Sequence, residues 1–434
     1  MTVLEQERPT PAPLLRNGYA LMANTAVTAA LGMAYWLVAA RLYPPAAVGA
    51  GGAAVSALLF VAGVSQMNFM GAVVRFLPVA GAASKRLLAS TYAVSCAAAG
   101  VLGTVAVATS PWWAPDDSPL RSGAPAAAVF VIGVAAWCVF VLQDSALTAV
   151  RQAVWVPVEN GLYGLAKLAM LVGFAVAVAG PATGTGILAS WALPAAACIV
   201  PVNLLLFRRF IPSHIAARRD HEPFPLSIRR VARFVGGDYV GSLFNQALIS
   251  LMPLLVVVLV GSEGGGHFYV AWTIATTMDL LASNLATSMT VEGALDEGRV
   301  AQFGREILRR VATVLVPVVA AAAALAGVVL GLFGAGYRSN SATLLRLLVL
   351  ATIPRALATV YVGLCRVERR VSHIAGVQAA QAVLVLGLAA ALVPWLGIVG
   401  AGVATLVGQT AVAVGVLPRL RRRLASAAGI AEID

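Results

Sequence analysis

Twelve apolar runs of about 20 residues each divide this sequence and leave only short polar stretches between them. A helix needs about 20 apolar residues to cross the roughly 30 Å hydrocarbon core of a bilayer. Only 11% of the residues are charged, against about 25% in soluble domains, so the sequence predicts a polytopic membrane protein. The runs lie at about 18–40, 46–66, 86–109, 124–143, 159–179, 186–207, 237–260, 267–290, 310–333, 343–364, 374–394 and 397–417.

The longest polar stretch divides these runs six and six. We therefore expect an all-α membrane protein with about twelve transmembrane helices in two six-helix bundles around a central cavity. Six crossings return the chain to its starting side, so both halves run the same way, as in the parallel repeats of some transporters. The predicted units are a cytoplasmic tail at 1–15, an N-terminal bundle at 16–207, a basic linker at 208–233, a C-terminal bundle at 234–418 and a tail at 419–434.

The positions of Lys and Arg predict the orientation in the membrane. When the polar stretches are assigned alternately to the two sides, 24 of the 30 Lys and Arg residues fall on the side of the termini. Four fall on the other side, and Lys167 and Arg355 lie inside predicted spans. This asymmetry predicts that both termini are cytoplasmic. It also explains the net charge of +12 without a nucleic-acid partner, and we expect none.

Several kinds of chemistry have no sequence signature here. The chain contains no GxxxxGK[ST] loop for ATP and no HExxH zinc motif, and its four cysteines show no CxxC spacing. We expect no metal site and no cofactor. Asp116 and Asp117 form an acidic pair beside Trp112 and Trp113, which is typical of a solvated loop next to interfacial tryptophans. We therefore expect that the protein is not an enzyme.

Three charged residues lie well inside predicted spans. Lys167 is about eight residues into the fifth, Asp279 is near the middle of the eighth, and Arg355 is about twelve residues into the tenth. Such residues are costly in a bilayer and normally face a cavity or a charged partner. Two interpretations stay open for the cations: a cationic lumen that attracts a diphosphate, or charge pairing, for example with Asp279, that fixes helix packing. Asp279 could equally bind a coupling ion.

Three stretches resemble a known family. The first two spans read NTAVTAALGMAYWLVAARLYPPAAVGAGGAAVSALLF, followed by GAVVRFLP, with Arg41 near the end of the first helix and Arg75 after the second. DSALTAVRQAVWVPVEN precedes the fifth span, and FYVAWTIATTMDLLASNLATSMTVEGALDEG surrounds the eighth. In these stretches the chain resembles the polysaccharide-flippase branch, O-antigen and teichoic-acid exporters, of the multidrug/oligosaccharidyl-lipid/polysaccharide exporter (MOP) superfamily.

The resemblance implies a bacterial plasma-membrane flippase that moves a polyprenyl-diphosphate-linked oligosaccharide outward by alternating access. It implies that Arg41, Arg75, Lys167 and Arg355 bind substrate and that Asp279 couples transport to a proton or a sodium ion. Membrane lipids, a polysaccharide polymerase and glycosyltransferases are the implied partners. The drug-export branch carries carboxylates deep in its N-terminal bundle, whereas Asp144 and Glu159 here lie at predicted span ends.

Two alternatives stay open. An ion-coupled multidrug antiporter of the same fold is the first, although a cationic lumen would repel cationic drugs in a low dielectric. A membrane-embedded glycosyltransferase or ligase is the second, and it would need an outer-face carboxylate that is essential for sugar transfer.

Overall fold

The computed structural model describes residues 11–177, 183–217, 228–295, 306, 308–309, 311–368 and 370–426, and nearly all of them are helical. Short helical turns link several of the longer helices. The longer elements are α1 (Pro11–Leu42), α2 (Pro45–Ser65), α3 (Phe69–Phe76), α4 (Ser84–Trp113), α5 (Ala124–Ala149), α6 (Trp155–Ala177), α7 (Gly184–Leu205), α8 (Ile211–Ala216), α9 (Ile228–Leu295), α11 (Val316–Ala324), α12 (Ala326–Phe333), α13 (Ala335–Val367), α14 (Val371–Leu396) and α15 (Ile398–Ser426). The short turns are η1 (Leu77–Val79), η2 (Gly81–Ala83), η3 (Pro119–Arg121), η4 (Leu206–Phe210) and η6 (Val311–Leu315).

The prediction of about twelve membrane-spanning helices is confirmed. Ten helices in the described parts of the chain are long and apolar enough to span a bilayer, and the bent pair α11–α12 makes eleven. That count takes α9 as one helix, but its backbone leaves helical geometry at Gly261, where φ is +78°. Glycine adopts this conformation readily, so α9 is two apolar arms joined at a sharp turn, and the number of spans becomes twelve.

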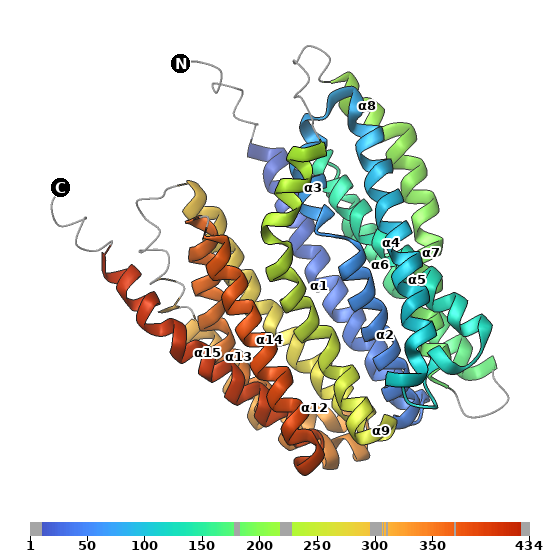
Figure 1. The fold of residues 1–434 in the computed structure, drawn as a ribbon, viewed down its shortest axis with the longest axis vertical. Coiled ribbons are helices and arrows are strands. Elements are labelled where there is room, and N and C mark those ends of the chain that lie inside the picture. Colours follow the sequence, from blue (N-terminus) through green and yellow to red (C-terminus); the bar gives the residue numbers. More distant parts are fainter. Residues whose placement is uncertain are drawn as a thin grey trace.

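Two helical bundles lie side by side (Figure 1). Helices α1 to α8 form one, α11 to α15 lie in the other, and α9 runs between them. The first arm of α9 packs along α2: the Tyr239 hydroxyl donates to the carbonyl of Val64 at 2.8 Å, and the Gln246 amide donates to that of Leu59 at 3.2 Å. The all-α, two-bundle membrane fold is therefore confirmed, while the central cavity stays a prediction.

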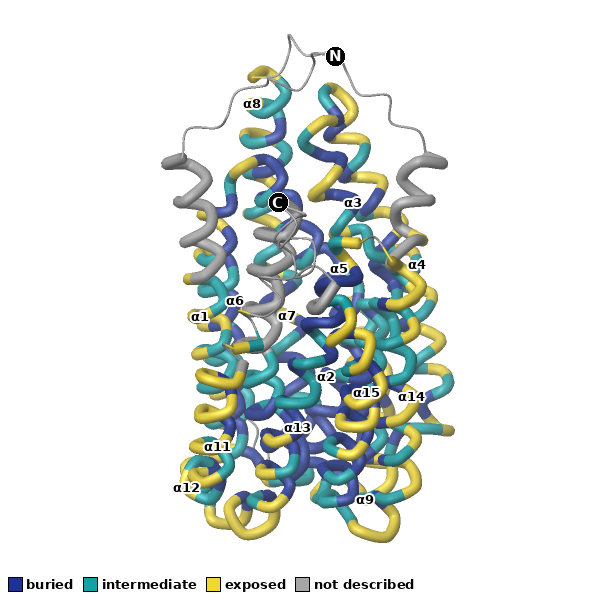
Figure 2. Tube along the Cα trace, turned by 90° about the vertical axis from the view of Figure 1, so that its left-hand side faces the viewer, coloured by how far each residue is buried: buried dark blue, intermediate teal, exposed yellow. Residues whose placement is uncertain are grey.

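Helix α2 is the most enclosed helix of the N-terminal bundle. Every residue from Ala47 to Leu58 is buried, and most are Ala or Gly. Small side chains allow neighbouring helices to approach closely inside a membrane protein. In Figure 2 the buried trace is concentrated around α2 and α13, below the level of α3 and α8. The two bundles are thus packed together most closely in this half of the molecule.

The predicted linker and tails are partly helical. Helix α7 continues through the π-helical turn η4 into α8, which ends at Ala216, and α9 begins at Ile228. Helix α1 begins at Pro11, and α15 extends to Ser426. The remainder of the predicted linker and tails is outside the described residues, and the domain boundaries stay predictions.

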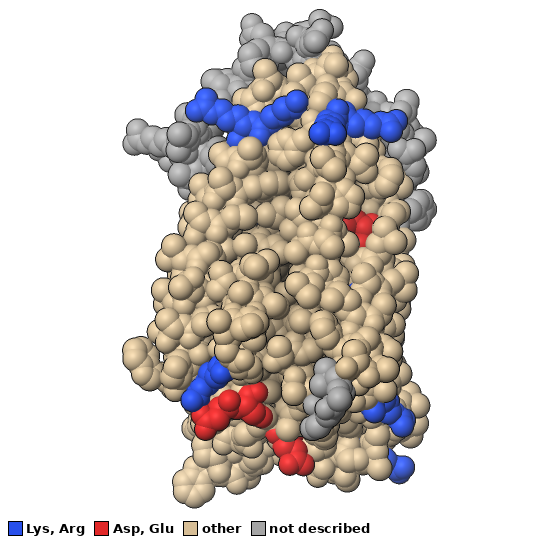
Figure 3. Space-filling view, turned by 90° about the vertical axis from the view of Figure 1, so that its right-hand side faces the viewer, with Lys and Arg blue, Asp and Glu red and all other residues tan. Residues whose placement is uncertain are grey.

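Charges are unequally distributed along the molecule. On the face drawn in Figure 3, Lys and Arg form a band near the end that carries α3 and α8, while most of the Asp and Glu lie near the opposite end together with some further Lys and Arg. The orientation stays a prediction, and following it we refer to the end carrying α3 and α8 as the inner end. The opposite end, with the α1–α2 turn and Gly261, is the outer end.

Candidate functional site

Lys167 lies in a cage of aromatic rings inside the N-terminal bundle. Its Nζ is 4.0 Å from the ring centroid of Trp191, 4.7 Å from that of Tyr35 and 5.2 Å from that of Tyr163. The residue is only 5% exposed. The described residues include no carboxylate within ion-pairing distance of it. Cation–π contacts of this kind contribute about 2 kcal/mol each when they are desolvated, so the rings can stabilise the ammonium group in place of a counterion.

Three helices build this cage. Tyr163 and Lys167 are four residues apart on α6 and therefore share one face, while Tyr35 comes from α1 and Trp191 from α7. The hydroxyls of Tyr35 and Ser190 share a 2.7 Å hydrogen bond that fixes the ring. Trp36, the next residue of α1, packs on Tyr269 of α9 with ring centroids 4.5 Å apart. Tyr35 of the cage is therefore adjacent in sequence to Trp36, which makes a contact between the two halves of the chain.

A cluster of carboxylates and amides lies closer to the inner end of the same bundle. The Gln143 amide donates to Glu159, and the Asn203 amide donates to the side-chain oxygen of Gln143 at 2.6 Å. Beside them, Asn160 donates to Asp144 at 3.0 Å. Glu159 is 4% exposed, and each carboxylate has one buried oxygen without a hydrogen-bond partner. Two acidic groups that meet only neutral donors in the described structure can take up a proton or a monovalent cation.

Sequence reasoning did not include this cluster in the site. The signal was present as two adjacent polar pairs, Gln143–Asp144 and Glu159–Asn160, sixteen residues apart at the end of one span and the start of the next. Helices α5 and α6 are antiparallel neighbours, so the pairs meet. Asn203 on α7 completes the contact, and nothing in its local sequence indicates this.

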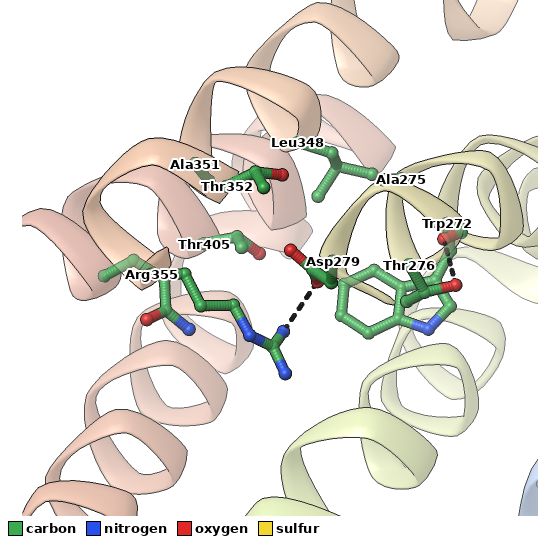
Figure 4. A pocket seen from close by; sticks show the side chains of 10 residues that line it. Trp272, Ala275, Thr276, Asp279, Leu348, Ala351, Thr352, Arg355 and Thr405 are labelled. Carbon is green, nitrogen blue, oxygen red and sulfur yellow. Dashed lines mark hydrogen bonds and ion pairs between the residues drawn. The ribbon is translucent and has the colours of Figure 1, made fainter. Parts of the chain in front are cut away.

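Asp279 and Arg355 form an ion pair inside the C-terminal bundle. Their charged atoms are 2.9 Å apart, and the two side chains are 18% and 17% exposed. Figure 4 shows the guanidinium of Arg355 pointing at Asp279 across a small cavity that Thr352, Thr405 and Trp272 also line. The cavity volume of about 10 Å³ is room for a single water molecule. The charge pairing that the sequence left open for Arg355 is thus observed.

The bundles meet at the outer end through backbone contacts. A Cβ added to Gly49 of α2 would lie 1.9 Å from the carbonyl oxygen of Ser262, and one added to Gly266 would lie 2.0 Å from that of Pro45. Both distances are far below van der Waals contact, so only glycine fits at either position. We call this contact of Pro45 and Gly49 with Ser262 and Gly266 the outer seal.

Two polar contacts reinforce the outer seal. Arg41, at the end of α1, donates through Nε and a terminal nitrogen to the carbonyl of Leu332 in α12, at 2.8 and 2.5 Å. The Ser262 hydroxyl donates to Asp117 at 2.7 Å. Each bond joins a residue of the N-terminal half to one of the C-terminal half.

The four cations expected to bind substrate do not form one cluster. Arg75 lies in α3 at the inner end, 5.9 Å above the ring of Phe76, while Arg41 is at the outer end. Lys167 and Arg355 are interior residues of different bundles. The substrate-binding and ion-coupling roles stay predictions.

No protein-family model matches this sequence, and no curated protein is similar to it. Several solved structures are similar in fold. For an inward-facing multidrug resistance MATE family transporter of the MOP superfamily, the TM-score is 0.69 at 15% identity, over 93% of this chain and 96% of that one. For an outward-facing MATE family transporter the TM-score is 0.60 at 15% identity, over 96% of both chains.

A third similar structure is a MOP superfamily transporter from Pyrococcus furiosus, with a TM-score of 0.57 at 13% identity over 96% of both chains. The reverse polarity of its binding pocket is described as suggesting a different function. All three identities are low, so the likeness concerns the fold. The chain described here has the two-bundle helical fold of the MATE transporters of the MOP superfamily.

Proposed function

We propose that this chain is a membrane transporter that carries a polyprenyl-diphosphate-linked oligosaccharide across the bacterial plasma membrane by alternating access. The observation that carries the proposal is Lys167, a buried ammonium group whose contacts in the described structure are aromatic faces. A diphosphate would supply the missing negative charge, whereas a cationic substrate would be repelled in this low-dielectric surrounding. The lipid tail would stay in the bilayer while the sugar head crosses between the bundles.

The outer seal supports alternating access. The bundles are locked together at the outer end by backbone contacts that open only if the bundles move apart. The higher TM-score with the inward-facing MATE structure than with the outward-facing one agrees with this arrangement. We infer that the structure represents the inward-facing state. Transport would then require the outer seal to separate.

The remaining roles complete the proposal. Asp279, released from Arg355, would bind a coupling proton or sodium ion. Arg41 and Arg75, at the two ends of the passage, would meet the diphosphate on leaving and on entry. Membrane lipids surround the bundles, and a polymerase or glycosyltransferase would receive or supply the glycan.

The test is flipping of a fluorescent lipid-linked oligosaccharide in vesicles that contain the purified chain. Lys167→Met, which keeps the length of the side chain and removes its charge, should lower the flipping rate at least tenfold. Lys167→Arg should retain partial activity, because the positive charge at this position matters more than the shape of the side chain. Lys85→Met, at an exposed inner-end position, is the matched control. Wild-type flipping by Lys167→Met would overturn the proposal.

One observation favours a second candidate, an ion-coupled multidrug antiporter. The buried carboxylates of Asp144 and Glu159 offer a site for a proton or a drug cation without any substrate phosphate. The neighbouring structures are described as multidrug resistance transporters. If the chain exports lipophilic cations and does not flip lipid-linked oligosaccharide, this second candidate replaces the first.

A further inference from the structure

A groove on the surface of the N-terminal bundle, close to its inner end, is not used in the proposed flipping of a lipid-linked oligosaccharide. It lies between α6 and α7, has a volume of about 120 Å³ and is lined by apolar side chains except for the buried Glu159. On α6 the lining residues Trp155, Val158 and Leu162 recur at helical spacing and are 42%, 48% and 60% exposed. Pro201, Val202 and Leu205 line the facing side on α7.

The inner end of the groove is closed by two aromatic rings. Trp155 opens α6, and Phe210 ends the π-helical turn η4, with ring centroids 6.0 Å apart. A π turn widens the helix by one residue and is frequent at functional sites. Tryptophan also prefers the level of the lipid headgroups. The two rings therefore mark the depth at which the hydrocarbon ends and the headgroups begin.

Basic residues follow directly beyond the rings. Arg208 and Arg209 belong to the same π turn as Phe210, and both are exposed. Arg151 lies in the turn before α6 in the left-handed conformation, with φ +61°, and it is also exposed. The described residues include no carboxylate paired with any of the three. The groove thus lies at the depth of the lipid acyl chains. It ends beside Arg151, Arg208 and Arg209, which lie at the depth of the lipid phosphates and have no carboxylate partner among the described residues.

We propose that this groove binds one acyl chain of an anionic phospholipid of the inner leaflet, whose phosphate contacts Arg208 and Arg209. The charge at the rim selects an anionic head, because each exposed Arg near a headgroup favours negative lipid. A groove of about 120 Å³ has room for part of a flexible hydrocarbon chain and none for a folded partner. The lipid would be a resident of the N-terminal bundle and would not be transported, so the proposal stands whether or not the chain flips a glycan.

The test uses the full-length protein in nanodiscs and the fluorescence of Trp155. Brominated acyl chains quench a tryptophan only on contact, and the contribution of Trp155 among the eight tryptophans is the difference between wild type and Trp155→Phe. Brominated phosphatidylglycerol should quench this contribution at a lower mole fraction than brominated phosphatidylcholine does. Arg208→Gln/Arg209→Gln should weaken that preference about tenfold.

Two further variants separate the groove from general membrane contact. Arg421→Gln/Arg422→Gln removes an adjacent basic pair from α15 in the other bundle and should keep the full preference. Val158→Phe, which fills the groove, should reduce quenching of Trp155 by both lipids, and native mass spectrometry should detect one fewer tightly retained phosphatidylglycerol. Equal quenching of Trp155 by the two brominated lipids, or an unchanged preference in Arg208→Gln/Arg209→Gln, would overturn the proposal.

Discussion

The backbone of Gly266 in α9 lies directly on the carbonyl of Pro45 in α2, so a single added Cβ at Gly266 would come within 2.0 Å of that oxygen. The contact joins the two halves of the chain at the outer end. The closed arrangement of the two halves therefore requires glycine at position 266.

Gly266→Ala should therefore favour the state in which the outer ends are apart. Overpacking of this kind costs about 1–3 kcal/mol in the closed state. The expected result is at least a fivefold increase in labelling of Ala53→Cys, a buried α2 position, by a membrane-impermeant maleimide in a background without the native cysteines. The matched control is Gly100→Ala, because nothing lies within 4 Å of a Cβ at that helical position.

Arg41→Gln should weaken the same closure. The charged hydrogen bonds to the Leu332 carbonyl are lost, and such bonds contribute about 1.5–3 kcal/mol. Arg346 offers a control of the same chemistry, because it donates to the carbonyl of Ala323 within one bundle. Labelling of Ala53→Cys should rise in Arg41→Gln and stay at the wild-type level in Arg346→Gln. Equal labelling of both variants would contradict a role for Arg41 in closure.

The Arg355–Asp279 pair separates structural from functional roles through a double variant. Arg355→Ala alone leaves a buried carboxylate without its counterion and should lower the free energy of unfolding by about 3–5 kcal/mol. Arg355→Gln/Asp279→Asn removes both charges and should restore most of this loss in a thermal unfolding assay. If the restored protein still fails to transport, the pair acts in transport; wild-type transport would reduce its role to packing.

Glu159→Gln tests the carboxylate and amide cluster. The new amide keeps a hydrogen-bonding group beside Gln143 and removes a buried charge, so stability should be unchanged or higher. If the cluster holds a coupling proton, transport should lose its dependence on an imposed proton gradient. Glu263→Gln, an exposed position at the outer end, is the control. Transport by Glu159→Gln that still follows the gradient would exclude Glu159 as the coupling group.

The number of spans could be predicted because apolar length is a local property. Each of the twelve runs corresponds to a helix, a helical arm or the bent pair α11–α12. The breaks were harder to predict. The α11–α12 bend of 59° falls in a run of Ala, Val and Leu, and α3 follows the left-handed Met67 and Asn68, neither of which is glycine. Such conformations are fixed by packing, which local preferences do not describe.

The partners of the interior charges could be predicted only in part. Pairing of Arg355 with Asp279 is one of the two interpretations that the sequence allows, because both charges fall inside predicted spans. The sequence does not indicate the surroundings of Lys167, because Tyr35, Tyr163 and Trp191 come from three helices. Each of these aromatic residues lies in an apolar run where an aromatic side chain is ordinary. A charge inside a span indicates that a partner exists, and only the helix arrangement shows which one.

The single turn at Gly261 joins the two arms of α9 with almost no chain between them. A hinge this short cannot absorb a displacement of one arm as a longer loop would, so the second arm must follow the first. Inserting a few flexible residues after Gly261 would therefore uncouple the arms mechanically while leaving every helix intact.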